Sequence, residues 1–338
     1  NEGGFSLMST LTNPNASKEA RALMDYLGSI AGEKVLSAQH TKPKDPVELR
    51  DLQALTGQLP AICGFELLGY SPNVNYADTD QDAIAEVMEN RDTMDTAVDW
   101  ALNKKGIVTY TWHWFSPMRG HNKAFYTRYT DYDLEVAMQG DCPEYTALLR
   151  DMDLMADYLK RFRDLGIPIL WRPLHEAEGG WFWWGAKGPE PCKKLWRLMY
   201  DRYVNLHGLN NLIWVWNSTN PDWYPGDDCV DIISRDVYQQ GDQPLKPEFD
   251  QLRPLSPEKP IALAECGMHP NADRMFQEGA PWLWSMNWCF GAVLSQEGGA
   301  VANMGPEWAD KRQEMIQRQK AFYASARVIN LGDLPWNR

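Results

Sequence analysis

The stretch EYTALLRDMDLMADYLKRFRDLGIPILW, residues 144–171, decides the fold class of this chain. Its first part, 144–165, carries apolar residues at helical spacing and is predicted to be a long amphipathic helix. Gly166 stops that helix, and the apolar run 167–171 that follows directly is typical of a buried strand. A helix that leads straight into a buried strand is one unit of an α/β fold with parallel strands.

The same alternation of strand and helix runs along the rest of the chain. Further helices are predicted at 17–31, 80–103 and 193–207. Strands are predicted at 35–38, 60–65, 106–112, 167–171, 212–216, 230–238, 261–264 and 282–288. Eight strands, mostly separated by helices and without a linker or low-complexity break, predict a single-domain (β/α)8 TIM barrel over residues 1–338 rather than a doubly wound sheet.

Composition narrows the range of partners. The net charge of −13 argues against nucleic acid and against anionic membranes, because both require a basic face. The chain has no apolar run of the roughly 18 residues that a membrane-spanning helix needs, and we expect a monomer. Its 16 tryptophans are unusually many. We expect roughly half of them to line a ligand cleft, and the others to be core or surface residues.

The cysteines and the first residues bear on cofactors and location. None of the six cysteines forms a CxxC pair, so we predict no zinc site. The sequence does not decide whether two of Cys142, Cys192 and Cys229 form a disulfide. The start of the chain, residues 1–4, is interpreted as a terminus from which a signal peptide has been removed, which favours a secreted or cell-envelope protein.

A barrel of this kind carries its chemistry at the C-terminal ends of its strands. Polar side chains occur at these ends with unusual regularity. In chain order they are His40, Glu66, His113, His175, Glu176, Asn217, Asp236, Tyr238 and Glu265. We therefore predict a polar site at this end of the barrel.

Two of these residues suggest the chemistry. Glu176 follows the fourth strand and precedes a Gly-Gly bend with three tryptophans, in the segment RPLHEAEGGWFWWG of residues 172–185. Glu265 ends the seventh strand, and in a barrel these two strand ends face each other across the mouth. Carboxyl groups about 5–5.5 Å apart would cleave a glycosidic bond with retention of configuration, and groups about 6.5–9.5 Å apart with inversion. Indole rings stack on the apolar faces of pyranoses.

The segment 171–185, together with Ala264-Glu265-Cys266-Gly267, resembles the signatures of glycoside hydrolase family 26, whose main members are β-mannanases. The resemblance implies a retaining endo-β-1,4-mannanase that acts on β-mannan or mannooligosaccharides without a cofactor. It also implies roles for particular residues, listed here in turn: Glu176 as acid/base, Glu265 as nucleophile, and His113, His175, Trp181, Tyr238 and Trp288 as substrate-binding residues, of which Tyr238 would also hydrogen-bond the nucleophile. From its own chemistry, Arg172 is expected to support the nucleophile through a buried ion pair or hydrogen bond. Trp282 and Trp284 compete with Trp288 for its role.

Glu178 departs from this pattern, because a small or neutral polar residue is expected there. It would raise the pKa of the acid, bind a substituent of the substrate, or lie in solvent as a loop residue. The loop 124–144 would close one end of the cleft or form plain surface.

Three other functions stay open. The same machinery would serve β-1,3-xylan or mixed-linkage β-glucan. A non-catalytic glycan-binding protein would need the tryptophans but not both glutamates. A metal-dependent hydrolase would use His113, His175, Glu176 and Glu265, although no HExxH spacing supports it.

Overall fold

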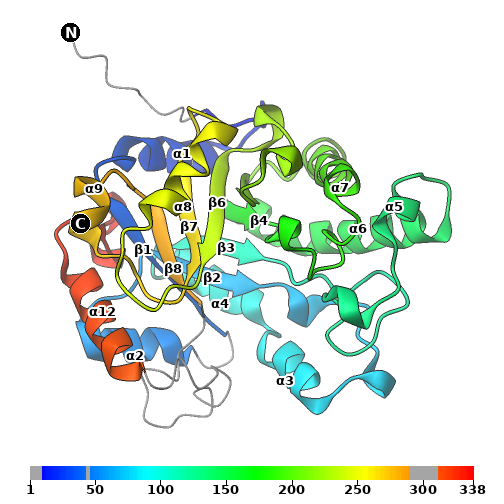
Figure 1. Cartoon of the computed structure of the whole chain (residues 1–338), viewed down its shortest axis with the longest axis horizontal. Helices are drawn as coiled ribbons and strands as arrows, with labels where there is room; N and C mark the ends of the chain where they lie inside the picture. Colours follow the sequence, from blue (N-terminus) through cyan, green and yellow to red (C-terminus); the bar gives the residue numbers. More distant parts are fainter. Residues whose placement is uncertain (1–9, 43–45, 289–310) are drawn as a thin grey trace.

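The computed structural model describes residues 10–42, 46–288 and 311–338, and these residues form a closed parallel barrel with helices around it (Figure 1). The eight barrel strands are β1 (Val35–His40), β2 (Ile62–Glu66), β3 (Ile107–Thr111), β4 (Ile169–Arg172), β5 (Leu212–Asn217), β6 (Ile232–Val237), β7 (Ile261–Cys266) and β8 (Trp284–Asn287). Each pairs in parallel with the next, and β1 pairs with both β2 and β8, which closes the barrel. The predicted (β/α)8 TIM barrel is confirmed.

A short additional strand, β9 (Val328–Ile329), was not predicted. It pairs in parallel with Val35 and Leu36 at the start of β1, before β1 meets β2 at Ala38. Because β1 begins before β2 does, its early backbone groups need another partner, and β9 supplies it.

The helices of eight or more residues in the described part of the chain are α1 (Lys18–Ile30), α2 (Val47–Thr56), α3 (Gln81–Glu89), α4 (Thr93–Leu102), α6 (Pro143–Asp164), α7 (Pro189–Asp201) and α12 (Arg312–Ala324). Shorter ones are α5 (Leu134–Ala137), α8 (Lys246–Asp250) and α9 (Ala272–Gln277). The helix predicted at 144–165 is thus confirmed as α6. The one predicted at 193–207 begins earlier, with prolines in its first turn, and continues past α7 as the π-helical turn Arg202–Leu206.

The single helix predicted at 80–103 is wrong, because the chain breaks between α3 and α4. Asn90 ends α3, and Asp92 has a left-handed backbone with φ of 66°. Asp and Asn tolerate this conformation better than other non-glycine residues, so two polar residues in the middle of an apolar pattern suffice to turn the chain.

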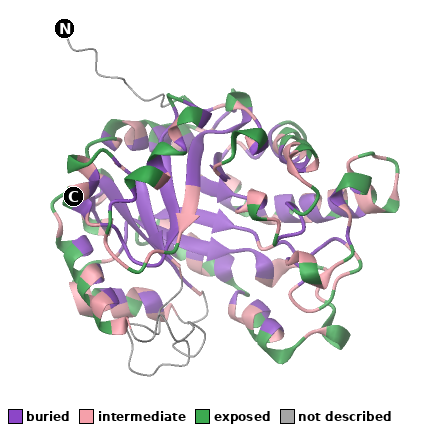
Figure 2. Ribbon diagram, viewed as in Figure 1, coloured by how far each residue is buried: buried purple, intermediate pink, exposed green. Residues whose placement is uncertain are grey.

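The core has two layers, one inside the barrel and one between the strands and the helices. Figure 2 shows that most residues of the strands, which contribute to both layers, are buried. Inside the barrel, residues such as Leu170, Ile213 and Val215 pack together, and Leu23 and Leu27 of α1 join the same cluster. The outer layer lies between strands and helices and holds most of the large aromatic side chains. Because the inside is packed with side chains, the barrel has no channel, and chemistry is confined to its mouth.

Tryptophans serve the core more than we predicted. Among the described residues, only Trp181, Trp288 and Trp336 are not buried, so far fewer than half are exposed to a cleft. All of the cysteines in the described ranges are free thiols, so the pairing left open among three of them does not form, and Cys289 lies outside these ranges. No helix of the described chain is long and apolar enough to span a bilayer.

Candidate active site

The turn after β4 places Glu176 at the barrel mouth. Leu174 and Glu176 have left-handed backbones with φ of 55° and 53°, a strained conformation for residues with a side chain. The N–H of Glu176 donates to the backbone oxygen and to Oδ1 of Asn217, at 3.1 and 2.9 Å. Asn217 is the last residue of the neighbouring strand β5, so this contact holds the strained turn in place.

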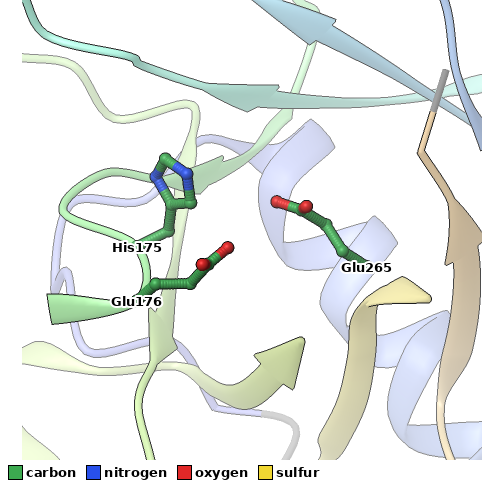
Figure 3. Close-up of side chains that lie close together, drawn as sticks. All are labelled: His175, Glu176 and Glu265. Atoms are coloured by element: carbon green, nitrogen blue, oxygen red, sulfur yellow. The ribbon is translucent and has the colours of Figure 1, made fainter. Parts of the chain in front are cut away.

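Glu265 lies near the end of β7, across the mouth from Glu176. Figure 3 shows the two carboxyl groups directed toward each other, with the His175 ring beside them. One ligand atom from each of the three side chains lies within 4.8 Å of the others. Two carboxyl groups whose oxygens approach this closely favour the retaining arrangement, with its spacing of about 5–5.5 Å, over the wider inverting one.

The carboxyl of Glu265 is held on both of its oxygens. Arg172, buried at the end of β4, donates from Nη2 to Oε2 of Glu265 at 2.5 Å and to Oγ1 of Thr111 at 3.1 Å. The hydroxyl of Tyr238 donates to Oε1 of Glu265. A cation and a hydroxyl that both point at one carboxyl favour its ionised form.

Asp236 is a third buried carboxyl in the site. It accepts from Nη1 of Arg172 at 3.2 Å and from Nδ2 of Asn217 at 2.9 Å, and it lies close enough to the carboxyl of Glu176 for the two pKa values to affect each other. Its place at the end of the sixth strand was noted in the sequence, but its contact with Glu176 was not predicted. The register of β6 against β7, which shifts between Arg235 and Asp236, places Asp236 beside Glu265.

Arg172 is the cation that lowers the pKa of all three carboxyls, Glu176, Asp236 and Glu265, but burial outweighs it and the three pKa values are raised. Burial raises the pKa of Glu176, and the charge of Glu265 raises it further. Burial and the charge of Asp236 raise the pKa of Glu265 to about 7, against the lowering effect of Arg172 and Tyr238. Burial raises the pKa of Asp236 to about 8 despite Arg172. The three groups titrate as a coupled set, in which direct contact with Arg172 and Tyr238 favours the charge on Glu265.

Two histidines close one side of the site. His113 donates from its backbone N–H to Oε1 of Glu66 at 2.5 Å, and its Nδ1 lies 2.7 Å from Oε2 of the same carboxylate. Burial lowers the pKa of His113, but the charge of Glu66 outweighs this and raises it overall. His175, 4.6 Å away between ring centroids, has its pKa lowered by burial and by the cationic His113. Glu66 therefore favours the charged form of His113, and burial favours the neutral form of His175.

The three tryptophans after the Gly-Gly bend have different surroundings. Trp181 is half-exposed, and its side chain lies close enough to the carboxyl of Glu176 to lower its pKa. Trp183 and Trp184 are buried, and their indole N–H groups donate to the backbone oxygens of Trp114 and His175 at 2.6 and 3.0 Å. Only Trp181 is placed to meet a ligand, and the other two anchor the turn.

The loop predicted over 124–144 packs against this turn. The ring of Tyr126 stacks on Phe182 with centroids 5.4 Å apart, and Thr127 donates to the backbone oxygens of Trp181 and Gly180 at 2.7 Å each. The loop therefore forms one flank of the mouth beside Trp181.

Trp288 lies on the side of the mouth near β1. Its ring stacks on His40 with centroids 3.8 Å apart, and it lies 5.8 Å from the ring of His113. Trp282 and Trp284, which competed with it in the sequence, are buried in the core. Of the three, only Trp288 is therefore available at the mouth.

Beside Glu176 lies a cavity of about 320 Å³ that Trp181, Thr219, Arg235 and Tyr238 help to line. It is large enough for a sugar ring and contains an aromatic face and several polar groups. Such a mixture suits a ligand with both apolar faces and hydroxyl groups.

The same three side chains that Figure 3 draws have the donor types of a metal site. Their surroundings do not suit a metal, however, because both oxygens of Glu265 already accept from Arg172 and Tyr238. A divalent ion would also lie beside the guanidinium, which repels it.

A pair of facing carboxyls at the C-terminal mouth of a parallel barrel, with an exposed indole next to one of them, is the arrangement of glycoside hydrolases. Residues 12–294 match the family model described as glycosyl hydrolase family 26. The chain belongs to this family.

Several relatives are similar over most of the chain. A mannan endo-1,4-β-mannosidase of Thermothelomyces thermophilus is 46% identical over 82% of this chain and 57% of its own length. A mannan endo-1,4-β-mannosidase B of Piromyces sp. is 30% identical over 96% of this chain and 54% of its own length. The chain thus spans little more than half the length of these relatives.

Two crystal structures share the fold. The Podospora anserina GH26-CBM35 β-(1,4)-mannanase has a TM-score of 0.84 and 37% identity, covering 100% of this chain and 72% of the other. A β-mannanase from a symbiotic protist of the termite Reticulitermes speratus, complexed with gluco-manno-oligosaccharide, has a TM-score of 0.81 and 30% identity, covering 98% and 99% of the two chains.

Proposed function

We propose that this chain is the single catalytic domain of a retaining endo-β-1,4-mannanase that cleaves mannan, glucomannan or galactomannan. The observation that carries the proposal is the pair Glu176 and Glu265, whose ligand atoms lie within 4.8 Å of each other. Glu265 accepts hydrogen bonds from Arg172 and Tyr238, which favour its ionised form, whereas burial and the charge of Glu265 favour the protonated form of Glu176. The printed activities of the relatives support mannan as the polymer. A polymer of this size requires an enzyme outside the cell, so we further propose secretion or attachment to the cell envelope.

In the first step, Glu265 attacks the anomeric carbon while Glu176 protonates the leaving oxygen. Arg172 and Tyr238 keep the nucleophile ionised, and burial with the charge of Glu265 keeps the acid protonated. A covalent glycosyl-enzyme forms, and the sugar on the leaving side departs with the proton of Glu176.

In the second step, Glu176 acts as a base. Once Glu265 is esterified, its negative charge is gone, so the pKa of Glu176 falls and its carboxylate activates a water molecule. That water attacks the anomeric carbon, releases Glu265 and restores the starting configuration.

Four further side chains are assigned to the sugar. His113 and His175 lie beside the carboxyl pair and are placed to bind hydroxyl groups of the sugar that undergoes attack. Trp181 is the stacking surface on the leaving side, because its indole is half-exposed and lines the same cavity as Glu176. Trp288 is the corresponding surface near β1.

The test is mutation of each carboxyl. Glu176→Ala and Glu265→Ala should each remove nearly all activity on polymeric mannan, while circular dichroism shows that the fold survives. Wild-type rates in both variants would contradict the assignment. Proton NMR of the first product should show the β-anomer, and an initial α-anomer would exclude retention.

The choice of polymer needs its own assay. Galactomannan, glucomannan, β-1,3-xylan and lichenan, compared at equal enzyme concentration, separate the mannanase from the other two hydrolases that the sequence left open. A higher rate on xylan or lichenan would move the proposal to that polymer without changing the carboxyl pair.

A further inference from the structure

We propose that Glu178 is a positioning residue that ties the turn carrying the acid to the facing wall of the cleft, and so aims the carboxyl of Glu176 at the leaving oxygen. This inference rests on the proposed function of Glu176. Glu178 is the residue that departs from the family pattern, and it lies in the lining of the cavity beside Glu176.

Both carboxylate oxygens of Glu178 accept hydrogen bonds from the loop after β5. Its Oε1 accepts from the backbone N–H and the hydroxyl of Thr219, at 2.7 and 2.8 Å. Its Oε2 accepts from the backbone N–H of Asn220 at 2.8 Å. These three charge-assisted bonds join the turn after β4 to the loop after β5. Thr219 itself lines the cavity beside Glu176.

Other contacts hold the two ends of this turn: Asn217 binds the N–H of Glu176, and Thr127 donates to the backbone oxygen of Gly180. The segment between these ends is a single 3₁₀ turn, Ala177–Gly179, flanked by left-handed residues, with φ of 53° at Glu176 and 74° at Gly180. Its internal bonds are Gly179 to Glu176 at 3.1 Å and Gly180 to Ala177 at 3.3 Å. Asn217 anchors the start of the turn, and Glu178 anchors its middle.

The position of Trp181 depends on the same turn. Its ring folds back over Gly179 so closely that a side chain there would meet the ring at 2.1 Å. The indole in turn lies close enough to the carboxyl of Glu176 to lower its pKa. Loss of the bonds from Glu178 to Thr219 and Asn220 therefore loosens the middle of the turn, between the acid and Trp181, while its two ends stay attached.

The experiment compares two substrates of one sugar. The natural oligosaccharide needs the proton from Glu176, whereas a 2,4-dinitrophenyl glycoside has a leaving group that needs none. In Glu178→Ala we expect kcat/KM to fall about 10- to 100-fold on the oligosaccharide, because displacements near 1 Å cost about 100-fold. On the aryl glycoside it should change less than threefold.

Glu178→Gln tests these hydrogen bonds with a smaller change of the side chain than Glu178→Ala. Its amide oxygen still accepts from Thr219, but its NH₂ group cannot accept from Asn220, so we expect a loss between those of wild type and Glu178→Ala. Glu190→Gln is the matched control. Glu190 is 72% exposed on α7 and pairs with Lys193, and the variant should match wild type on both substrates.

Equal losses on both substrates in Glu178→Gln would overturn the proposal, because they would indicate general damage to the cleft. Unchanged rates on both substrates in Glu178→Ala would also overturn it. The wild-type polymer panel comes first and chooses the sugar for both substrates. If the panel selects a polymer of a sugar other than mannose, the proposed substrate is refuted, but the difference between the oligosaccharide and the aryl glycoside can still be measured. If no polymer is cleaved, both proposals are refuted.

Discussion

Replacement of Arg172 by methionine tests the electrostatic argument most directly. Met is an apolar side chain of comparable length, so Arg172→Met removes the charge and the donors from a residue that is 1% exposed. Two buried carboxyls, Glu265 and Asp236, lose the cation that contacts them at 2.5 and 3.2 Å. Tyr238 still donates to Glu265, but no other cation contacts this carboxyl among the described residues.

The magnitude follows from the cost of an unpaired buried charge. Breaking a buried ion pair from one side costs about 3–5 kcal/mol of unfolding free energy. At about 2–4 °C per kcal/mol, which applies to chains somewhat shorter than this one, the melting temperature should fall by roughly 10 °C at neutral pH. Activity should fall at least about 1000-fold, because the nucleophile is no longer held ionised.

The pH dependence gives this prediction its sign. Both carboxyls have pKa values in the folded wild type, about 7 and about 8, that lie above those of unfolded chains. Loss of Arg172 raises them further. Groups with raised pKa values stabilise the fold below the unfolded pKa and lose this contribution as pH rises through the folded pKa. The deficit of Arg172→Met should therefore be small at pH 5 and large at pH 9.

The assay is thermal unfolding of wild type and variant, followed by circular dichroism at pH 5, 7 and 9. A deficit that is the same at all three pH values would refute the reasoning, because a lost packing contact does not titrate. Arg197→Met is the matched control. Arg197 pairs with Asp228 on an exposed surface, where such pairs contribute about 0–1 kcal/mol.

Three further predictions follow from the site. Glu176→Ala should keep activity on a dinitrophenyl mannoside, and added azide should accelerate it and yield a β-glycosyl azide; absence of azide acceleration would contradict the role of acid/base. Trp181→Ala should raise KM with little change in stability, whereas Trp184→Ala, which empties a fully buried site, should cost about 3–5 kcal/mol in urea unfolding; the reverse order would contradict the burial argument. Activity should survive dialysis against EDTA, and a loss restored by Zn²⁺ would instead support a metal-dependent hydrolase.

The sequence predicted the barrel because its signals are local. Alternating apolar runs and amphipathic stretches, stopped by glycines such as Gly166, mark each unit without knowledge of the others. The break at Asn90 and Asp92 was missed because both residues also occur within helices, and only tertiary contact decides between the two. One such contact is the donation from the backbone of Met94 to the Tyr70 hydroxyl.

The sequence predicted which residues lie at the strand ends, but it did not predict which of them contact each other. Glu66 and His113 were both noted, yet their 2.7 Å contact depends on how two adjacent strands align. The same holds for Asp236, whose contact with Glu176 arises across the mouth. The role of Glu178 was out of reach because its partners, Thr219 and Asn220, lie about forty residues away in a loop without a motif.

The charge balance of the site explains why two similar glutamates act differently. Arg172 is one buried cation among three carboxyls, and in a poorly solvated site the least costly state is neutral overall, with a single carboxyl ionised. Glu265 has the closest contact with Arg172 and a second donor in Tyr238, so it carries that charge, while Glu176 and Asp236 keep their protons. When Glu265 becomes esterified, the cation is left without a counterion, and the least costly way to restore neutrality is for Glu176 to give up its proton. The same count of charges therefore makes Glu176 an acid in the first step and a base in the second, and Arg172 is the group that links the two.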